Sequence, residues 1–313
     1  MRETLRVADR DAPAVLAAPP PADLLLLTIA IAAVSTSAPL IAATAAPTLA
    51  IAFWRNAMAS GVLVPWAMFR HRDELRGLDA RERRLAVTAG VFLAAHFATW
   101  VPSVRFTSVA SATALVATQP IWAALIARRA GHHIPRRAWI GIAVAVTGAA
   151  LVTGVDVTVS GRALVGDVLA TIGGLFAAAY VTIGGEVRRN VSTTTYTTVC
   201  YLTAALALLA VCLIGQVSLA GYPADAWLKI VALTVGAQFL GHSLANRVLR
   251  TTSATVVSLS ILFEVPGASL IALVWLGQHP PAAAIPGLLL LLVGVGTVIT
   301  GSVRGAAPAV PAE

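Results

Sequence analysis

Long apolar segments alternate with short polar ones along almost the whole chain. A helix needs roughly 20 mostly apolar residues to cross the hydrocarbon core of a bilayer, and segments of about that length recur here. The pattern therefore predicts an all-α integral membrane protein with ten membrane-spanning helices. We place them near residues 23–43, 48–69, 85–104, 107–127, 138–155, 164–185, 194–215, 228–248, 252–276 and 282–303.

The composition excludes an ordinary soluble domain. The chain of 313 residues is 58% hydrophobic and 12% charged, whereas soluble domains carry about 25% charged residues. The formal net charge of +8 comes almost entirely from arginine. These arginines lie in the gaps between apolar segments and form no basic domain with interleaved aromatic residues. We therefore expect membrane lipid, and no nucleic acid, as a partner.

The positions of the basic residues predict the orientation of the chain. If the N-terminus is cytoplasmic, eighteen of the 22 Lys and Arg residues fall in cytoplasmic segments. Arg105 and Arg162 fall on the opposite side, and Arg55 and Lys229 lie within or at the edge of spans. Positive residues favour the cytoplasmic side, and an odd number of spans would scramble this bias. We expect a multi-pass protein of the inner (cytoplasmic) membrane with both termini cytoplasmic.

An internal repeat divides the chain into halves. A shift of 146 residues superimposes seven residues of uncommon type on identical ones. The pairs are His96 with His242, Pro120 with Pro266, Gly131 with Gly277, His133 with His279, Pro135 with Pro281, Gly141 with Gly287 and Gly148 with Gly294. Because the unit holds five helices, an odd number, the second copy must cross the membrane in the opposite sense, as in many transporters. We assign residues 22–155 and 162–303 to the two repeats, between a disordered cytoplasmic tail at 1–21 and a cytoplasmic tail at 304–313.

Several short motifs follow one another between residues 22 and 303. They are Pro47 with Trp54-Arg55, Thr107-Ser108-Val109-Ala110 leading to Pro120, Gly141 to Gly148, Thr252-Ser253-Ala254 leading to Glu264-Val265-Pro266, and Leu276-Gly277 before Gly287 and Gly294. In order and spacing they resemble the EamA-type ten-helix branch of the drug/metabolite transporter superfamily. The resemblance implies export of small metabolites, often amino acids or related polar compounds, driven by an ion or solute gradient. Glutamates that often follow the fourth and ninth helices in that family are replaced here by Arg128-Arg129 and Gln278, so their role does not transfer.

Glu264 is the acidic residue that stands out. It lies about 12 residues into the ninth predicted helix, close to the middle of the bilayer. A lone ionised carboxylate at that depth is costly and should face protein or water. Glu264 is therefore a candidate for exchanging a proton or binding a substrate amine. The alternative is a protonated side chain that joins helices by a hydrogen bond. Its repeat partner is Thr118, so a site at Glu264 is asymmetric.

Two histidines and one arginine are further candidates. His96 and His242 occupy equivalent positions near the centres of the third and eighth helices, where they could line a cavity and titrate near neutral pH. They could equally be neutral groups bonded to neighbouring helices. Arg55, about seven residues into the second helix, could bind a substrate carboxylate. It could also extend to the membrane surface or pair with Glu264 or Asp167.

Three more residues could line the same cavity. They are Trp54, Trp100 and Asn246, although membrane aromatics also act as interface anchors. Asp167 begins the sixth predicted helix near the outer surface, where we expect a solvated carboxylate.

Glycines recur at equivalent places in the fifth and tenth helices. Gly141 and Gly148, and likewise Gly287 and Gly294, are seven residues apart. Two helical turns separate them, which predicts a smooth stripe that permits close contact between helices.

Other classes of protein fit less well. We expect no cofactor and no metal, because Glu264 with the two histidines is the only conceivable ligand cluster. A nucleotide-driven pump needs a phosphate-binding loop with a lysine, and the surroundings of Lys229 resemble no such loop. An intramembrane hydrolase is a distant alternative, because Gly241-His242-Ser243-Leu244-Ala245 lacks the last glycine of the nucleophile motif. We predict a non-enzymatic secondary transporter of a small polar metabolite, with a proton or another ion as possible coupling partner; a lipid flippase or multidrug exporter is the nearer alternative.

Overall fold

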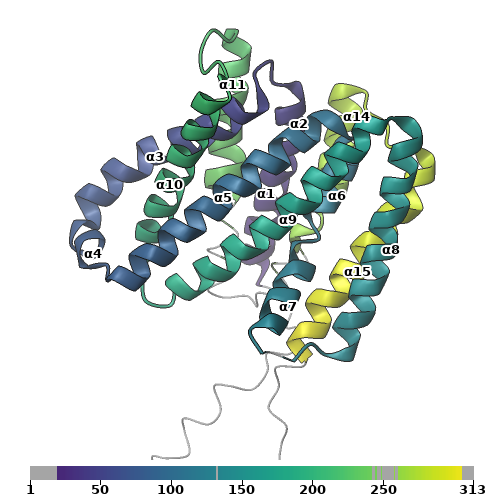
Figure 1. Ribbon diagram of the computed structural model, residues 1–313, viewed down its shortest axis with the longest axis horizontal. Helices are drawn as coiled ribbons and strands as arrows, with labels where there is room; N and C mark the ends of the chain where they lie inside the picture. Colours follow the sequence, from purple (N-terminus) through teal and green to yellow (C-terminus); the bar gives the residue numbers. More distant parts are fainter. Residues whose placement is uncertain are drawn as a thin grey trace, which may run out of the picture.

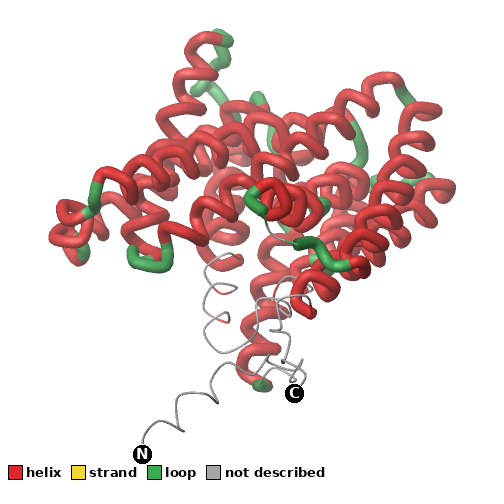
Figure 2. The backbone as a smooth tube through the Cα atoms, turned by 60° about the horizontal axis from the view of Figure 1, so that its bottom comes forward, coloured by secondary structure: helices red, strands yellow, loops and turns green. Residues whose placement is uncertain are grey.

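The structure is a computed structural model, and it describes most of the chain. The described residues are 20–131, 133–241, 244, 248, 257 and 260–304. Within them the chain forms helices joined by turns and short loops, with no β-strand (Figure 2). The all-α prediction is confirmed for this part of the chain. The tail predicted at 1–21 lies outside it except for its last two residues, since Pro21 already begins the first helix; the tail at 304–313 lies outside it after Arg304.

The helices follow one another along the chain with few residues between them. They are α1 (Pro21–Ser35), α2 (Ser37–Ala43), α3 (Thr48–Arg70), α4 (Arg72–Gly77), α5 (Ala80–Phe106), α6 (Val109–Val116), α7 (Gln119–Arg129), α8 (Arg136–Val159), α9 (Gly161–Val187), α10 (Thr193–Ile214), α11 (Ala224–Leu233), the π-helix η1 (Thr234–Gly241), α14 (Glu264–Leu276), the 3-10 turn η2 (Ala282–Ala284) and α15 (Ile285–Arg304).

Seven helical segments within the described residues are long and apolar enough to cross a membrane. They run Pro21–Ala43, Ala80–Phe106, Val109–Arg129, Arg136–Val159, Gly161–Val187, Thr193–Ile214 and Ala282–Gly301. The apolar helix α14 has 13 residues, and α3 is 23 residues long but carries Arg55 within it. The chain is therefore built as a multi-pass membrane protein, and the count of ten spans stays a prediction.

Local sequence sets where the helices begin. The Asp79 carboxylate accepts from the Glu82 amide at the start of α5, and the Glu82 carboxylate accepts from the Asp79 amide, which forms a reciprocal cap. The hydroxyls of Ser108 and Ser192 cap α6 and α10. A proline precedes each of α1, α3, α8 and α11, where its lack of an N–H stops continuation of an earlier turn.

The helices pack in a row with one paired edge. α3, α10, α5 and α9 lie side by side across the molecule, and α8 with α15 forms the far edge (Figure 1). In this view α1 passes behind α5 and α9, and it packs against η1 and α14. Alanines such as Ala50, Ala89 and Ala145 fill much of the buried core. Small side chains let neighbouring backbones approach, which is how helices gain packing energy in lipid.

The paired edge is held by the glycine stripe. A Cβ atom on Gly141 would lie 2.8 Å from the Gly294 carbonyl oxygen, and one on Gly148 would lie 2.7 Å from the Gly287 carbonyl oxygen. The stripes were predicted to permit close contact between helices, and α8 and α15 make such a contact. Under the 146-residue shift Gly141 corresponds to Gly287 and Gly148 to Gly294, so each glycine meets the counterpart of the other. That reciprocity is the contact pattern of a two-fold axis between α8 and α15.

Two further local features recur at equivalent places. A turn at 117–118 separates α6 from α7, and a turn at 262–263 precedes α14. After these half-helices end, Gly131 has φ 91° and Gly277 has φ 64°. Glycine is the residue that adopts this left-handed conformation without strain, which explains the identical residue at both positions.

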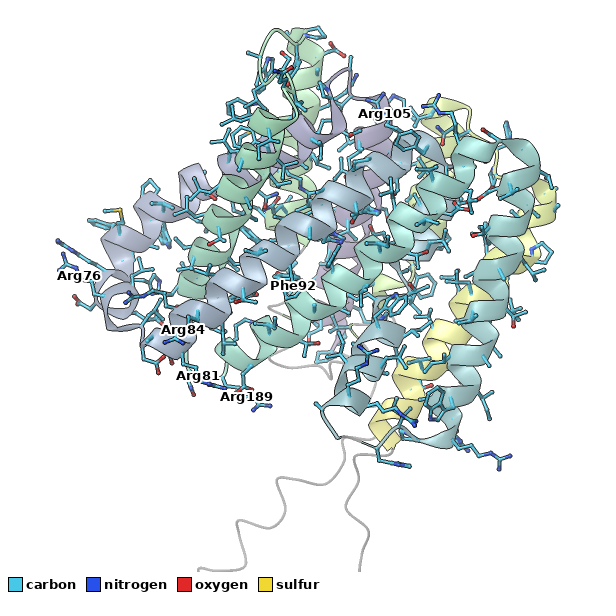
Figure 3. All side chains as sticks on the ribbon, viewed as in Figure 1. Arg76, Arg81, Arg84, Phe92, Arg105 and Arg189 are labelled. Carbon is cyan, nitrogen blue, oxygen red and sulfur yellow. The ribbon has the colours of Figure 1, made fainter. Side chains whose placement is uncertain are left out.

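Exposed arginines lie at the two ends of the helices. The labelled side chains of Arg76, Arg81, Arg84 and Arg189 lie at one end, and Arg105 lies at the other (Figure 3). The sequence assigns the first four to the cytoplasmic side and Arg105 to the opposite side. The structure thus separates along its helices the residues that the sequence separates across a membrane.

At the same end as the four arginines, Glu74 ties α4 to the start of α10. Its carboxylate accepts hydrogen bonds from the amide and hydroxyl of Ser192 and from the hydroxyl of Thr195, each at 2.6 Å. Partial burial raises the pKa of Glu74, but these hydrogen bonds outweigh burial and lower the pKa to about 2. The ionised carboxylate therefore caps the positive N-terminal end of α10.

Replacing Glu74 by glutamine should destabilise the fold by about 1–2 kcal/mol near neutral pH, because a charged acceptor of several hydrogen bonds is lost. The folded-state pKa lies below the unfolded one, so this contribution is present above about pH 4.3 and is lost as pH falls toward 2. Thermal unfolding in detergent should separate wild type from Glu74→Gln at neutral pH and bring them together in acid. The exposed Asp73→Asn in the same helix is the control, and a Glu74→Gln difference that persists in acid contradicts the ionised cap.

Substituting alanine in the glycine stripe should also destabilise the fold. A methyl group on Gly148 would overlap the Leu291 backbone nitrogen of α15, whereas one on Gly154, in the same helix, would meet nothing within 4 Å. We expect Gly148→Ala to lower the free energy of unfolding by about 1–3 kcal/mol and Gly154→Ala to leave it unchanged or raised. Equal thermal unfolding of the two variants would show that α8 and α15 do not depend on this contact.

Candidate functional site

Three irregular stretches of helix meet inside the molecule. α1 gives way to α2 at Thr36, η1 is wound as a π-helix, and α14 starts after a turn. A Cβ atom on Gly236 of η1 would lie 3.9 Å from the Thr36 hydroxyl, and one on Gly267 of α14 would overlap the Ser35 hydroxyl. Interrupted and π-helical segments recur at binding sites in membrane proteins. This meeting point is therefore where we look for a site.

Arg55 reaches this region from α3. Its side chain is 2% exposed, and its Nε donates a 3.1 Å hydrogen bond to Oε1 of Gln238 in η1. The guanidinium carbon lies 4.3 Å from the ring centroid of Phe97 on α5, an arrangement that partly offsets the loss of water. Nη1 of Arg55 and Nε2 of Gln238 are buried, and neither has a hydrogen-bond partner among the described residues. Within the described part of the chain, two buried donors thus lack an acceptor, an arrangement that is costly for a folded protein.

Glu264 stands at the first residue of α14 and is half-buried. The turn at 262–263 interrupts the helix predicted for 252–276 just before this residue. Arg55 and Glu264 are close enough for their charges to interact, but they are not among the direct ion pairs of the described residues. The positive end of the α14 dipole also favours a carboxylate here. The two opposite charges are therefore neighbours that are not joined.

His96 connects two helices next to this site. Its Nδ1 lies 2.9 Å from the Gly173 carbonyl oxygen of α9. A carbonyl oxygen only accepts, so Nδ1 carries the hydrogen of this bond. The ring stacks on Trp100 with centroids 5.7 Å apart and an interplanar angle of 9°. Through Nδ1, His96 thus holds α5 against α9.

The remaining predicted site residues lie in different surroundings. Trp54 donates from Nε1 to the Leu219 carbonyl oxygen at 2.8 Å and contacts Trp227 edge-on, so it is bound to the loop between α10 and α11. Trp100 is 5% exposed, and its Nε1 has no hydrogen-bond partner in the described part of the chain. His242 and Asn246 lie outside the described residues.

Two features of the interior were not predicted. Gln238 is the direct partner of Arg55, and the available signal was that it is one of two side-chain amides, with Asn246, within the apolar run of the eighth predicted helix. Asp167 was expected to be solvated, but it is 1% exposed. The reason is that Gly166 lets α9 pack directly on the turn after α5, where a Cβ atom would lie 2.7 Å from the Thr107 backbone nitrogen.

The sequence profile of the EamA-like transporter family matches residues 21–154 and, separately, residues 164–300. The chain belongs to the EamA-like transporter family. The resemblance predicted from its motifs is confirmed. EamA-like proteins are membrane transporters, so the chain belongs to a family of transporters.

The fold is also found in a solved structure described as "Crystal structure of protein". It matches this EamA-like chain with a TM-score of 0.60 and 18% sequence identity, over 90% of this chain and 98% of the other. At that identity the likeness concerns the fold alone. No protein with a curated description matches the chain.

Removing both partners of the Arg55–Gln238 bond should cost less than the sum of the two single removals. Gln238→Leu leaves the buried guanidinium without its acceptor and should destabilise the protein by about 1–3 kcal/mol. Arg55→Met together with Gln238→Leu removes charge and amide alike and should cost less than the two single changes added. Thermal unfolding of the four proteins in detergent measures this coupling, and strict additivity would contradict a bond between the two side chains.

Proposed function

We propose that this EamA-family protein is a secondary transporter that exports a small polar metabolite with a carboxylate group, an amino acid or a related compound, across the cytoplasmic membrane. Ten membrane-spanning helices form two inverted repeats, residues 22–155 and 162–303, which expose a central site to each side in turn. Both termini face the cytoplasm. A gradient of protons, of another ion or of a second solute drives the movement.

Several observations support the architecture in this proposal. The family profile matches twice along the chain, and the reciprocal contacts of Gly141 with Gly294 and Gly148 with Gly287 suit two copies related by an axis in the membrane plane. In this proposal, α3, the continuous stretch of α11 and η1, and a span that includes α14 are the three spans beyond the seven long apolar helical segments. The segregation of arginines to opposite ends supports the orientation (Figure 3).

The buried guanidinium of Arg55 is the observation that supports a substrate with a carboxylate group. It lies where three irregular helical segments meet, and donors on Arg55 and Gln238 have no acceptor within the described residues. A carboxylate supplies two acceptor oxygens and the opposite charge, and arginine binds it strongly because its N–H groups are arranged as a planar fork. A bound carboxylate would satisfy both donors.

Glu264 extends the same argument to a second substrate group. Its carboxylate neighbours Arg55 without forming a direct ion pair. A zwitterion such as an amino acid would place its amine beside Glu264 and its carboxylate beside Arg55. Alternatively, Glu264 exchanges a proton in each cycle, which acidic residues inside membrane proteins commonly do. In both cases Glu264 gains and then loses a positively charged partner, the substrate amine or a proton, during transport.

A lipid flippase or multidrug exporter is the second candidate, and one groove favours it. The groove has a volume of about 400 Å³ and lies between α3 and α10. Its lining is mostly apolar and includes Phe53, Val64, Leu202 and Leu206. Such a lining suits part of an acyl chain or a hydrophobic drug, but it offers no charge to an amino acid.

Transport into proteoliposomes distinguishes these candidates. The purified chain would be reconstituted and given a pooled mixture of labelled metabolites, with and without an imposed pH gradient. Accumulation of carboxylate-bearing compounds that depends on the gradient is the expected result. Equilibration that ignores the gradient would replace the coupled mechanism with facilitated diffusion. Retention of no metabolite, together with flipping of a fluorescent lipid, would favour the flippase.

Substitutions at Arg55 should reduce transport in graded steps. Arg55→Gln removes the positive charge that faces the substrate carboxylate. It should lower kcat/KM for the retained substrate by about tenfold or more, which corresponds to a loss of about 1.4 kcal/mol or more. Arg55→Lys keeps the charge but loses the planar fork and should fall in between. The control Arg76→Gln removes a positive charge from the exposed α4 and should transport normally. Unchanged transport rates in Arg55→Gln would reject the carboxylate site.

Glu264→Gln tests the second group separately. An unchanged transport rate and an unchanged pH dependence in this variant would reject the role of Glu264.

A further inference from the structure

A second group of buried acids lies apart from Arg55 and Glu264. Asp156, in the last turn of α8, is 3% exposed, and Asp167, in the second turn of α9, is 1% exposed. The chain reverses between them at Ser160, which caps α9. Gly166 presses α9 onto Thr107, in the turn between α5 and α6. We call Asp156 and Asp167 the acid pair.

Two threonine hydroxyls border the acid pair. The Thr107 hydroxyl donates to Oδ2 of Asp156 at 3.3 Å, and both Thr107 and Thr153 lie beside Asp167. Even so, the two Asp167 carboxylate oxygens are shielded from solvent and make no hydrogen bond of ordinary geometry within the described residues. A hydroxyl has one proton to donate, and Thr107 directs its proton to Asp156. Asp167 is therefore a buried carboxylate with only weakly bonded hydroxyls beside it and no ion-pair partner among the described residues.

The charges around the acid pair favour a bound cation there. Asp156 and Asp167 are near enough to repel each other, and two neighbouring carboxylates cannot both remain ionised when buried unless a positive charge joins them. The two arginines flanking this end of the helices are directed elsewhere: Arg162 lies over the Phe106 ring at 5.2 Å, and Arg105 donates to the Thr44 carbonyl oxygen. Neither acid takes part in an ion pair among the described residues. The negative end of the α8 dipole adds to the negative potential at Asp156.

We propose that the acid pair, together with the hydroxyls of Thr107 and Thr153, binds one small monovalent cation, either a proton or Na⁺. Carboxylate and hydroxyl oxygens are hard ligands, which suit such ions. The set comes from three segments, the α5–α6 turn, α8 and α9, so binding holds these segments together. Ca²⁺ takes about six to eight oxygen ligands, more than two carboxylates and two hydroxyls readily supply.

The site is separate from the proposed substrate site. Arg55, Gln238 and Glu264 belong to α3, η1 and α14, whereas the acid pair belongs to α8 and α9. The binding of a cation can therefore be tested without a known substrate. That this cation is the coupling ion of transport rests on the proposed function, and it follows from the position of the acids within two of the helices that span the membrane.

Thermal unfolding of the purified full chain in detergent tests the site. NaCl is varied at alkaline pH against choline chloride at constant ionic strength, and pH is then lowered in choline chloride alone. A bound cation stabilises the folded state by mass action, so Tm should rise by about 2–4 °C for each tenfold increase in the occupying ion above its Kd. A rise with Na⁺ identifies Na⁺ as the occupant, and a rise with acidity that ignores Na⁺ identifies the proton.

Variants decide whether the response comes from the acid pair. Asp156→Asn and Asp167→Asn each remove the charge with little change of shape and should abolish the response, whereas the exposed Asp73→Asn should keep it. If neither asparagine variant folds, Thr153→Val takes their place. It should shift the response to a higher Na⁺ concentration, because a ligand is lost, or, for the proton, to a higher pH, because the hydroxyl no longer stabilises the ionised carboxylate. A wild-type protein without any response, a response only to Mg²⁺ or Ca²⁺, or a response kept in both asparagine variants would overturn the proposal. Because no substrate is used, failure here leaves the transport proposal standing, and failure of transport leaves this result unaffected.

Discussion

Inside a bilayer no water is available to pair with a backbone amide or carbonyl group, so every such group must find its partner within the protein. This constraint explains why the described chain consists of helices with short connections. It also restricts where a helix can be broken. The α1–α2 junction at Thr36 contacts both the π-helix η1 and helix α14, which begins after the turn at 262–263. The same region holds the buried guanidinium of Arg55, because a charge in lipid needs the polar groups that broken helices expose.

The sequence predicted those features that depend on length, spacing and residue size. Segment lengths indicate the apolar helices, and the 146-residue shift pairs Gly131 with Gly277, which share a left-handed conformation in the structure. The glycine spacing predicts close contact between helices, and α8 and α15 make such a contact. These properties follow from one helix at a time, or from the identity of small residues. They require no knowledge of how each helix is rotated about its axis.

The features that could not be predicted depend on how each helix is rotated about its axis and on where it ends. Packing between helices sets both. Arg55 and Gln238 are 183 residues apart in the chain. The sequence does not show which faces of their two helices meet, so Gln238 could not be assigned as the partner of Arg55. Asp167 looked solvated because it is near a helix start, yet the absence of a side chain on Gly166 buries it. The turn that places Glu264 at the start of a half-helix has no strong marker, since Ile261-Leu262-Phe263 is apolar throughout. The predicted roles of His242 and Asn246 concern residues outside the described part and stay predictions.

The backbone contact between α8 and α15 has a mechanical consequence for the proposed motion. One of these helices ends the first repeat and the other ends the second, and glycines on both bring the two backbones into direct contact. When two halves related by a two-fold axis rock against each other, points on that axis move least. The α8–α15 contact would then serve as a stationary pivot, and the opposite edge of the molecule, formed by α3 and α10, would have the longest lever arm and the largest displacement.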